Sequence, residues 1–553
     1  MVTGATAAGT EQQDLLPGVS VAQEVDLTPH GPVAYTVITL PAPDASSLAS
    51  LGPVLPGGTL TSPSESVPQI EQDLAPTAFS IGVDGDFANT AGTLPNGIVV
   101  SGGVLEHTPN SARSSIGFES NGSMVVARIA FAGTWQGTGQ RRPLTGVNQQ
   151  PGSSQTVLFT PAWGATAPAV ANGAVAVLDP FPPVSVGAAT LAGTVASAGD
   201  ASAPTSIPPD GAVLVSTGTE AAKLTAEAQS GGSVSVRLTL PSAWSGVASA
   251  LGGGPLLVKA GKAVFDTSES FDPGELGSRD ARAAVGQLAN GDVLLVTVDG
   301  GQPGESVGMT NYELAQLLVR LGAVTAAGLQ YGVAATAAFD GQLLDRPESG
   351  AAKPVREALL YEYQGVYTPP PSAPVLTKAT AAGGETLTYE LVRPSSVTAT
   401  VIDPNGTVTQ VDAGQRNPGT YHFPFPVGGA EGTWHWHVTA TDDLGRQSSD
   451  DVTFTYDLTL SGLQVPKSAG SSGLRVAFTL SRPATVTLQL DTAGGTVIDT
   501  GTPTQLGAGP QALTWTGETS TGTNAPRGSY VVHVLATSSI GTSDASAAFS
   551  WAG

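Results

Sequence analysis

The sequence predicts an N-terminal domain of the α+β class followed by two all-β sandwiches. Three observations predict this: the overall composition, one stretch with clear hairpin and helix signals, and an internal repeat. The 553 residues include 70 Gly and 42 Pro, and only 12% are charged. β-Branched residues suit pleated strands while Gly and Pro suit turns, so this composition indicates many short strands. At roughly 150 residues per domain, the chain is too long for one ordinary domain.

The charge balance excludes several classes of partner. With 22 Lys and Arg against 45 Asp and Glu, the formal net charge is −23, which repels nucleic acid and anionic lipid. The absence of cysteine excludes disulfides and thiol chemistry. No run approaches the roughly 20 apolar residues of a transmembrane helix. Residues 1–18 lack the segments of a signal peptide. On composition and charge we nevertheless expect an extracellular or cell-surface protein, whose export signal is not in this numbering. The alternative is a protein that is not exported by that route.

We expect residues 1–19 to form a flexible lead and residues 20–367 to form the first domain. It contains a buried strand, AFSIGV, followed directly by Asp84, Gly85 and Asp86. Carboxylates at the end of a buried strand suit a binding site on a rigid frame. The alternative is that both aspartates only make hydrogen bonds within a turn.

Residues 282–334 carry the clearest local signals. AAVGQL and DVLLVTV are joined through Asn290-Gly291, a dipeptide that favours tight β-turns, so a hairpin is predicted. Thr310 to Glu313 then form a capping box, and leucines at helical spacing mark one face of a helix that Gly322 can end. The next run, AVTAAGLQYGV, is a predicted buried strand.

The composition changes after Tyr367, at the sequence TPPPSAP. We expect a Pro-rich linker over 368–375, then two units over 376–457 and 458–553. ELVRPSSVTATVIDPNGTV in the first unit is similar to TLSRPATVTLQLDTAGGTV in the second. Units of about 90 residues with alternating short strands predict immunoglobulin-like β-sandwiches. They resemble the Ig-like repeat of flagellar hook-capping proteins, which implies attachment to the cell envelope or self-association.

Three further groups of polar residues are candidates for chemistry. Arg282 starts a buried strand, where a guanidinium suits a phosphodiester or carboxylate, or else an internal ion pair with Asp280 or Asp299. Glu313 could act as an acid or base, although its capping-box position already gives it a structural role. The pair His435 and His437 shares one face of a strand, which favours a solvated face over a metal site because no third ligand is nearby. We predict no metal site and no cofactor, with a divalent cation left open as an alternative.

Several segments taken in order resemble the phosphodiester glycosidase family over roughly residues 15 to 365. They are VDGDFAN, GGGPLLVKAG, RAAVGQLANGDVLLVTVDGG, GMTNYELAQLLVRLGA and DRPESGAAKPVREALL. The resemblance implies an α+β domain with a large twisted mixed sheet, and cleavage of a sugar-1-phosphodiester of the N-acetylglucosamine type. It implies catalytic roles for Asp84, Asp86 and Arg282. It implies substrate contacts for Gly85, Asp299, Gln330, Tyr331 and Arg346.

The sequence departs from the family's pattern after the predicted helix. The family's Asp-Gly-Gly-Gly-Ser hallmark aligns with Gln330 to Ala334, where only Gly332 is kept. Gln330 cannot ionise, and Tyr331 adds bulk where glycine allows close approach. We therefore predict a glycosidase-fold protein with a degenerate motif, serving as a glycan-binding or structural module with weak or no hydrolysis. An active hydrolase with a rearranged site and a purely structural surface component are the two alternatives, and the expected partner is a glycan or sugar phosphodiester.

Overall fold

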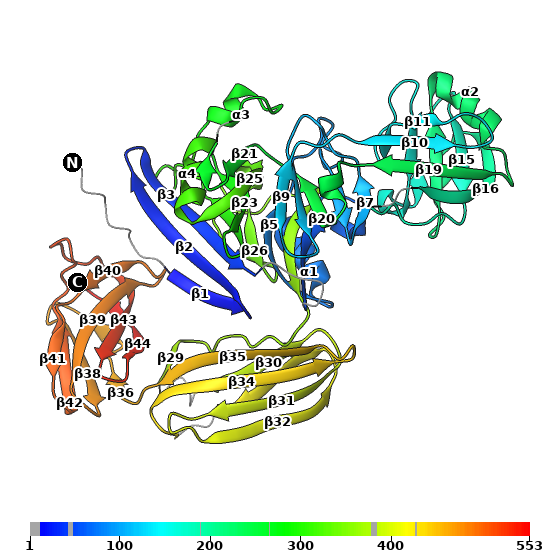
Figure 1. The fold of residues 1–553 in the computed structure, drawn as a ribbon. Helices are drawn as coiled ribbons and strands as arrows, with labels where there is room; N and C mark the ends of the chain where they lie inside the picture. Colours follow the sequence, from blue (N-terminus) through cyan, green and yellow to red (C-terminus); the bar gives the residue numbers. More distant parts are fainter. Residues whose placement is uncertain (1–10, 42–47, 188–189, 265, 378–383, 426–428) are drawn as a thin grey trace. The chain divides into compact units, whose positions relative to one another are not determined.

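The computed structural model describes residues 11–41, 48–187, 190–264, 266–377, 384–425 and 429–553 (Figure 1). It divides into two compact units, residues 1–364 and 365–553. The chain is mostly β, with 51% of residues in strands and 9% in helices. The α+β class expected for the first unit is therefore only partly confirmed. No helix among the described residues is long and apolar enough to cross a membrane.

The first sheet of unit 1 has eight strands, and it carries the stretch with the clearest sequence signals. In spatial order they are β1 (Glu11–Leu16), β2 (Val19–Thr28), β3 (Gly31–Leu40), β24 (Val293–Val298), β23 (Arg282–Leu288), β25 (Ala323–Tyr331), β21 (Leu256–Lys259) and β22 (Lys262–Ala263). All neighbouring pairs are antiparallel, so the expectation of a mixed sheet is wrong here. The strands β1 and β2 also occupy part of the expected lead, of which residues 1–10 lie outside the described residues.

The hairpin and helix predicted within residues 282–334 are confirmed. β23 and β24 pair around a turn in which Gly291 has φ +98°, a left-handed conformation that glycine adopts without strain. Helix α4 (Asn311–Arg320) follows, and its buried residues Leu314, Leu317 and Leu318 pack on Val296 and Ala284 of the sheet. The helix therefore covers one face of the sheet that contains β23, β24 and β25.

Two five-stranded sheets bring distant segments beside the end of β5. One has the order β27 (Gln342–Leu343), β26 (Ala337–Phe339), β5 (Phe79–Asp84), β28 (Ala358–Tyr363) and β4 (Ala49–Val54), with helix α1 (Val67–Leu74) packed on it. The other has the order β7 (Val104–His107), β6 (Val99–Ser101), β20 (Val247–Gly252), β8 (Ser115–Glu119) and β9 (Met124–Ala127).

A second eight-stranded sheet forms the rest of unit 1, beside helix α2 (Gly218–Glu227) (Figure 1). Its order is β11 (Arg142–Leu144), β10 (Ala132–Gln136), β19 (Ser233–Thr239), β16 (Leu191–Asp200), β15 (Ala174–Leu178), β18 (Ala212–Ser216), β13 (Thr156–Phe159) and β12 (Gly146–Val147). Only β12 and β13 run parallel. The short elements are β14 (Thr166–Ala167), β17 (Thr205–Ser206), α3 (Pro273–Gly277), η1 (Pro56–Gly58), η2 (Pro161–Trp163), η3 (Ser242–Trp244) and η4 (Gly332–Ala334).

Unit 2 contains two β-sandwiches, as the repeat predicts. The first joins β29 (Val375–Leu376), β35 (Gln447–Tyr456), β34 (Gly432–Asp442), β31 (Ser395–Ile402) and β32 (Val408–Arg416) with a pair, β30 (Thr386–Leu391) and β33 (Gly419–Pro424). The second joins β36 (Leu460–Gln464), β38 (Leu474–Leu480) and β42 (Gly509–Trp515) with β37 (Ser468–Ala469), β44 (Thr542–Trp551), β43 (Gly528–Thr537), β39 (Ala484–Thr492), β40 (Val497–Thr500) and β41 (Thr504–Leu506). Trp434 and Trp436, which alternate with His435 and His437 along β34, are buried in the first core.

Candidate functional site

The first candidate, Asp84, lies fully buried at the end of β5. Its Oδ1 accepts a hydrogen bond from the N–H of Thr336 at 3.0 Å, and its own N–H donates to the carbonyl of Thr336 at 3.1 Å. Burial raises the pKa of Asp84 well above its ordinary value, and the neighbouring carboxylate of Asp345 raises it further. Burial also raises the pKa of Asp345 to about 8 and that of Asp299 to about 6. Burial therefore favours the protonated forms of Asp84 and Asp345 over their ionised forms.

The carboxylate of Asp86 is enclosed by backbone groups. Its Oδ1 accepts from the N–H of Phe87 at 2.8 Å and its Oδ2 from the N–H of Gly97 at 2.5 Å. A Cβ placed on Gly252 would lie 2.1 Å from that Oδ2, and one placed on Gly97 would lie 2.9 Å from it. Burial raises the pKa of Asp86 to about 6. This carboxylate is thus enclosed by main chain and not presented to a ligand.

The third candidate, Arg282, is held by carbonyl oxygens. Its Nε donates to Met309 at 3.0 Å, its Nη1 to Glu275 at 3.2 Å and its Nη2 to Ser278 at 2.5 Å. The side chain is only 2% exposed. The alternative of an internal ion pair with Asp280 or Asp299 is therefore not how this guanidinium is held, since it donates to the carbonyls of Glu275 in α3, Ser278 and Met309.

Aromatic rings close the space in front of Arg282. The Tyr331 ring covers the guanidinium at 4.8 Å from its Cζ to the ring centroid. Phe87 contacts Tyr331 edge to face at 5.7 Å between centroids, and it contacts Phe271 in the same way at 5.5 Å. The remaining cavity, which Arg282 and Tyr331 line, measures about 10 Å³. That volume is at the lower limit for one water molecule, so no sugar fits.

The other predicted substrate contacts fall into pairs that do not share one cavity. The N–H of Gln330 donates to the carbonyl of Gly85 at 3.0 Å. The N–H of Arg346 donates to Asp299 Oδ1 at 3.2 Å, while its exposed guanidinium pairs with Glu305 at 3.3 Å. Asp299 and Arg346 line a separate cavity of about 210 Å³. The predicted substrate contacts therefore do not form one site, because the fold places Asp299 and Arg346 in a cavity that Gly85 and Gln330 do not line.

Two acids beside the candidates were missed in the sequence, the buried Glu357 and the half-buried Asp345. Glu357, which precedes β28, is fully buried, and its Oε1 accepts from the N–H of Asp86 at 3.1 Å. Burial raises its pKa well above the ordinary value, and the charge of Asp86 raises it further. Asp345 accepts from the N–H of Ala337 at 2.9 Å. A signal existed for Glu357, because an acid directly before the apolar run ALLYEY needs a buried partner.

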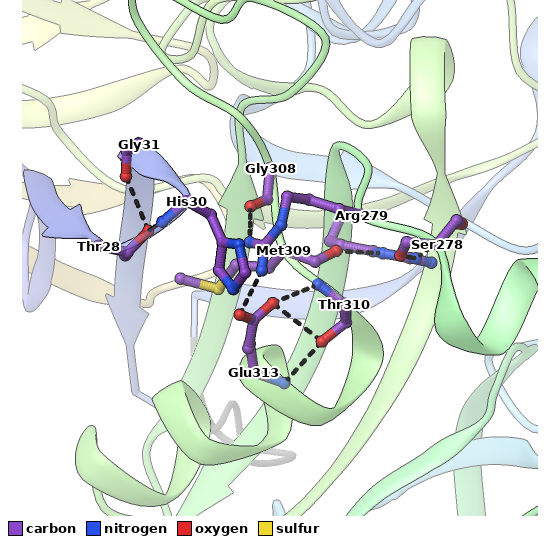
Figure 2. A network of polar contacts seen from close by, with 10 residues as sticks. Thr28, His30, Gly31, Ser278, Arg279, Gly308, Met309, Thr310 and Glu313 are labelled. Carbon is purple, nitrogen blue, oxygen red and sulfur yellow. Dashed lines mark hydrogen bonds and ion pairs between the residues drawn. The ribbon is translucent and has the colours of Figure 1, made fainter.

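Glu313 has the structural role that its capping-box position suggests. Its Oε2 accepts from the N–H of Thr310 at 2.8 Å, and its own N–H donates to Thr310 Oγ1 at 3.3 Å. Figure 2 shows that Arg279 reaches both Glu313 and the carbonyl of Gly308. The carboxylate is therefore occupied by a helix cap and an ion pair.

No cluster of three or more His, Asp or Glu suited to a metal ion occurs in the part of the chain that the structure describes. His435 and His437 do lie on one side of β34, where they contact the two oxygens of a single carboxylate, Asp451, at 3.1 and 3.3 Å. Each of these three side chains is well exposed, so the group is a solvated face of the sandwich.

Two segments of the chain match known protein families. Residues 185–362 match the family model of phosphodiester glycosidases, and residues 462–539 match that of the FlgD Ig-like domain. The two resemblances read from the sequence are therefore confirmed. The first match includes Arg282, Asp299, Gln330, Tyr331 and Arg346, whereas Asp84, Gly85 and Asp86 precede it. No curated protein matches the chain.

Solved structures with a similar fold include a hypothetical protein from Synechocystis. It is 25% identical with a TM-score of 0.54, and the match covers 64% of each chain, so the present chain spans about 64% of that protein's length. A Burkholderia pseudomallei protein is 22% identical over 60% of this chain and 74% of its own, with a TM-score of 0.48. The catalytic domain of zebrafish N-acetylglucosamine-1-phosphodiester alpha-N-acetylglucosaminidase is 13% identical over 64% and 88%, with a TM-score of 0.33.

Proposed function

We propose that this protein is an extracellular or cell-surface glycan-binding module built on the phosphodiester glycosidase fold, with no effective hydrolysis at the family's motif. The observation that carries the proposal is the closed site at Arg282. Tyr331 covers its guanidinium, and the cavity beside them measures about 10 Å³. A substrate cannot be bound for hydrolysis where there is no room for it.

The chemistry of the three candidate catalytic residues supports the same proposal. Phosphodiester hydrolysis needs donors that bind the phosphate oxygens and an acid or base that reaches the leaving group. The donors of Arg282 already bind carbonyls, and Asp84 and Asp86 accept hydrogen bonds from buried backbone N–H groups. Gln330 supplies no ionisable group in place of the family's aspartate.

The test is release of N-acetylglucosamine from a sugar-1-phosphodiester by the full chain, with an active family member as the positive control. We expect release at the rate of the buffer alone. Turnover comparable with the active enzyme would instead favour the alternative hydrolase, in which Asp84, Asp86 and Arg282 act in a rearranged site. In that case Asp86→Asn should abolish turnover, while Glu305→Gln on the exposed surface should leave it unchanged.

Unit 2 is proposed to hold the module at the cell envelope. The proposed organisation is a lead over 1–19, a glycosidase-like domain over 20–367, a linker over 368–375 and sandwiches over 376–457 and 458–553. A glycan panel and light scattering on the full chain separate the hypotheses. Binding of a glycan supports a module, whereas no binding together with self-association supports a purely structural component.

A further inference from the structure

A cavity of about 810 Å³ in unit 1 lies away from the glycosidase motif. That volume is within the usual range of ligand sites, roughly 300–1,000 Å³. One wall comes from β7, and the opposite walls come from loops at the ends of strands in the second eight-stranded sheet. The cavity contains none of the predicted site residues, so it is a separate place where a ligand could bind.

Proline rings form much of the wall. Pro161, Pro180, Pro182 and Pro209 line the cavity and are exposed at its surface. Each ring fixes its own backbone φ, so the wall is rigid before any ligand arrives. These apolar rings can contact the apolar faces of pyranose sugars, and a preformed wall lowers the entropy lost on binding.

Glu106 supplies a carboxylate to this cavity. It alternates along β7 with His107, whose ring is buried and whose Nδ1 contacts the carbonyl of Gly97 at 2.5 Å. Val104 and Glu106 both line the cavity, whereas Leu105 and His107 are buried, and the register of β7 against β6 shifts at Glu106. The Nδ2 of Asn148 donates to the Glu106 carbonyl at 2.7 Å and fixes the strand there.

Among the residues that the structure describes, the Glu106 carboxylate has no hydrogen-bond or ion-pair partner, although the residue is half-buried. Burial raises its pKa to about 7, as expected for an acid with no cation beside it. Asp210 adds a second acid to the lining, which contains no Lys, Arg or His. The cavity therefore disfavours phosphates and uronic acids and favours a cation.

We propose that this cavity binds a saccharide carrying a free ammonium group, such as a glucosamine oligomer, with the ammonium paired to Glu106 and the sugar rings against the proline wall. The saccharide part of this inference rests on the proposed function. The ammonium part rests on the unpaired carboxylate and on the absence of cations from the lining.

Calorimetry on the full chain tests the proposal with two ligands, the fully deacetylated glucosamine trisaccharide and its fully N-acetylated counterpart. We expect the deacetylated trisaccharide to bind at least tenfold more tightly. Glu106→Gln should weaken its binding at least tenfold, whereas Glu305→Gln, an equal change of charge on the exposed surface, should change it less than twofold. Val104→Phe narrows the cavity and should weaken both ligands if they occupy it.

Several outcomes would overturn the inference. Equal binding of the two trisaccharides, or no effect of Glu106→Gln, would remove the role of the ammonium while leaving glycan binding intact. Cyclohexylammonium binding as tightly as the trisaccharide would show recognition of an amine and not of a saccharide. If neither trisaccharide nor any member of a neutral glycan panel binds, the proposed function itself fails.

Discussion

At the scale of single residues, Arg282 shows how a conspicuous charge can be structural. The sequence suggested either a bound anion or an internal ion pair. The structure instead joins its donors to carbonyls of Glu275, Ser278 and Met309, which belong to α3, its C-terminal flank and the segment before α4. This guanidinium therefore ties two helices to the start of β23.

Arg282→Ala should consequently lower stability. Truncation leaves three carbonyls without their donor, and we expect a loss of roughly 2 to 4 kcal/mol in the free energy of unfolding. Urea unfolding of the full chain measures it. Arg346→Ala, at an arginine whose side chain is 74% exposed, should change stability by less than about 0.5 kcal/mol. An unchanged midpoint for Arg282→Ala would argue that this residue serves ligand binding.

Tyr331→Gly restores one glycine of the family's hallmark. It removes the ring that contacts Arg282 and Phe87, so we expect a loss of about 2 kcal/mol from this half-buried position. Release of N-acetylglucosamine should stay at background, because Gln330 still cannot ionise. A rise in turnover would show that bulk alone had closed a working site.

At the scale of elements, local sequence signals predicted the hairpin and the helix, but the pairing of strands far apart in the sequence could not be predicted. The Asn290-Gly291 turn and the Thr310–Glu313 capping box each depend on a few adjacent residues, so the hairpin and helix could be predicted. The pairing of β3 with β24 joins segments about 250 residues apart, and nothing in either strand specifies that neighbour. Likewise, the sequence showed that Tyr331 adds bulk, but its contacts with Phe87 and Arg282 could be identified only from the structure.

The capping box of α4 gives a test at this scale. Thr310→Ala removes the acceptor for the N–H of Glu313 and should cost about 1 kcal/mol. Tyr312→Ala, on the exposed side of the same helix, should cost less than half of that. Thermal denaturation followed by circular dichroism compares the two variants. Equal effects would mean that the cap contributes little to this helix.

At the scale of the whole molecule, the distribution of acids separates the two units. Buried carboxyls with raised pKa values gather in unit 1, including Asp84, Asp345 and Glu357. In unit 2, hydrogen bonds from arginine and backbone groups lower the pKa of Asp412 and Asp442, although burial raises the pKa of Asp450. The two units should therefore respond differently to pH.

Unit 1 should become more stable as the pH falls from 8 to 5. An acid with a raised folded pKa binds its proton more tightly in the folded state, so in this window the folded state holds more protons and stability increases with acidity. Carboxyls with lowered pKa values are ionised in both states over the same window, so unit 2 should change less. Calorimetry at several pH values should resolve two unfolding transitions. As the pH falls, the melting temperature of only one of them, that of unit 1, should rise strongly. A joint shift would contradict this assignment.

The contact of Gly97 and Gly252 with Asp86 bears on how substitution data should be interpreted. Neither glycine has room for even a methyl group, since a Cβ would lie 2.9 or 2.1 Å from Asp86 Oδ2. A saturation scan should therefore find both positions almost invariant, beside a motif that elsewhere marks a reactive centre. Intolerance there would record steric exclusion, and only a variant that folds normally but fails to bind its ligand would report on function.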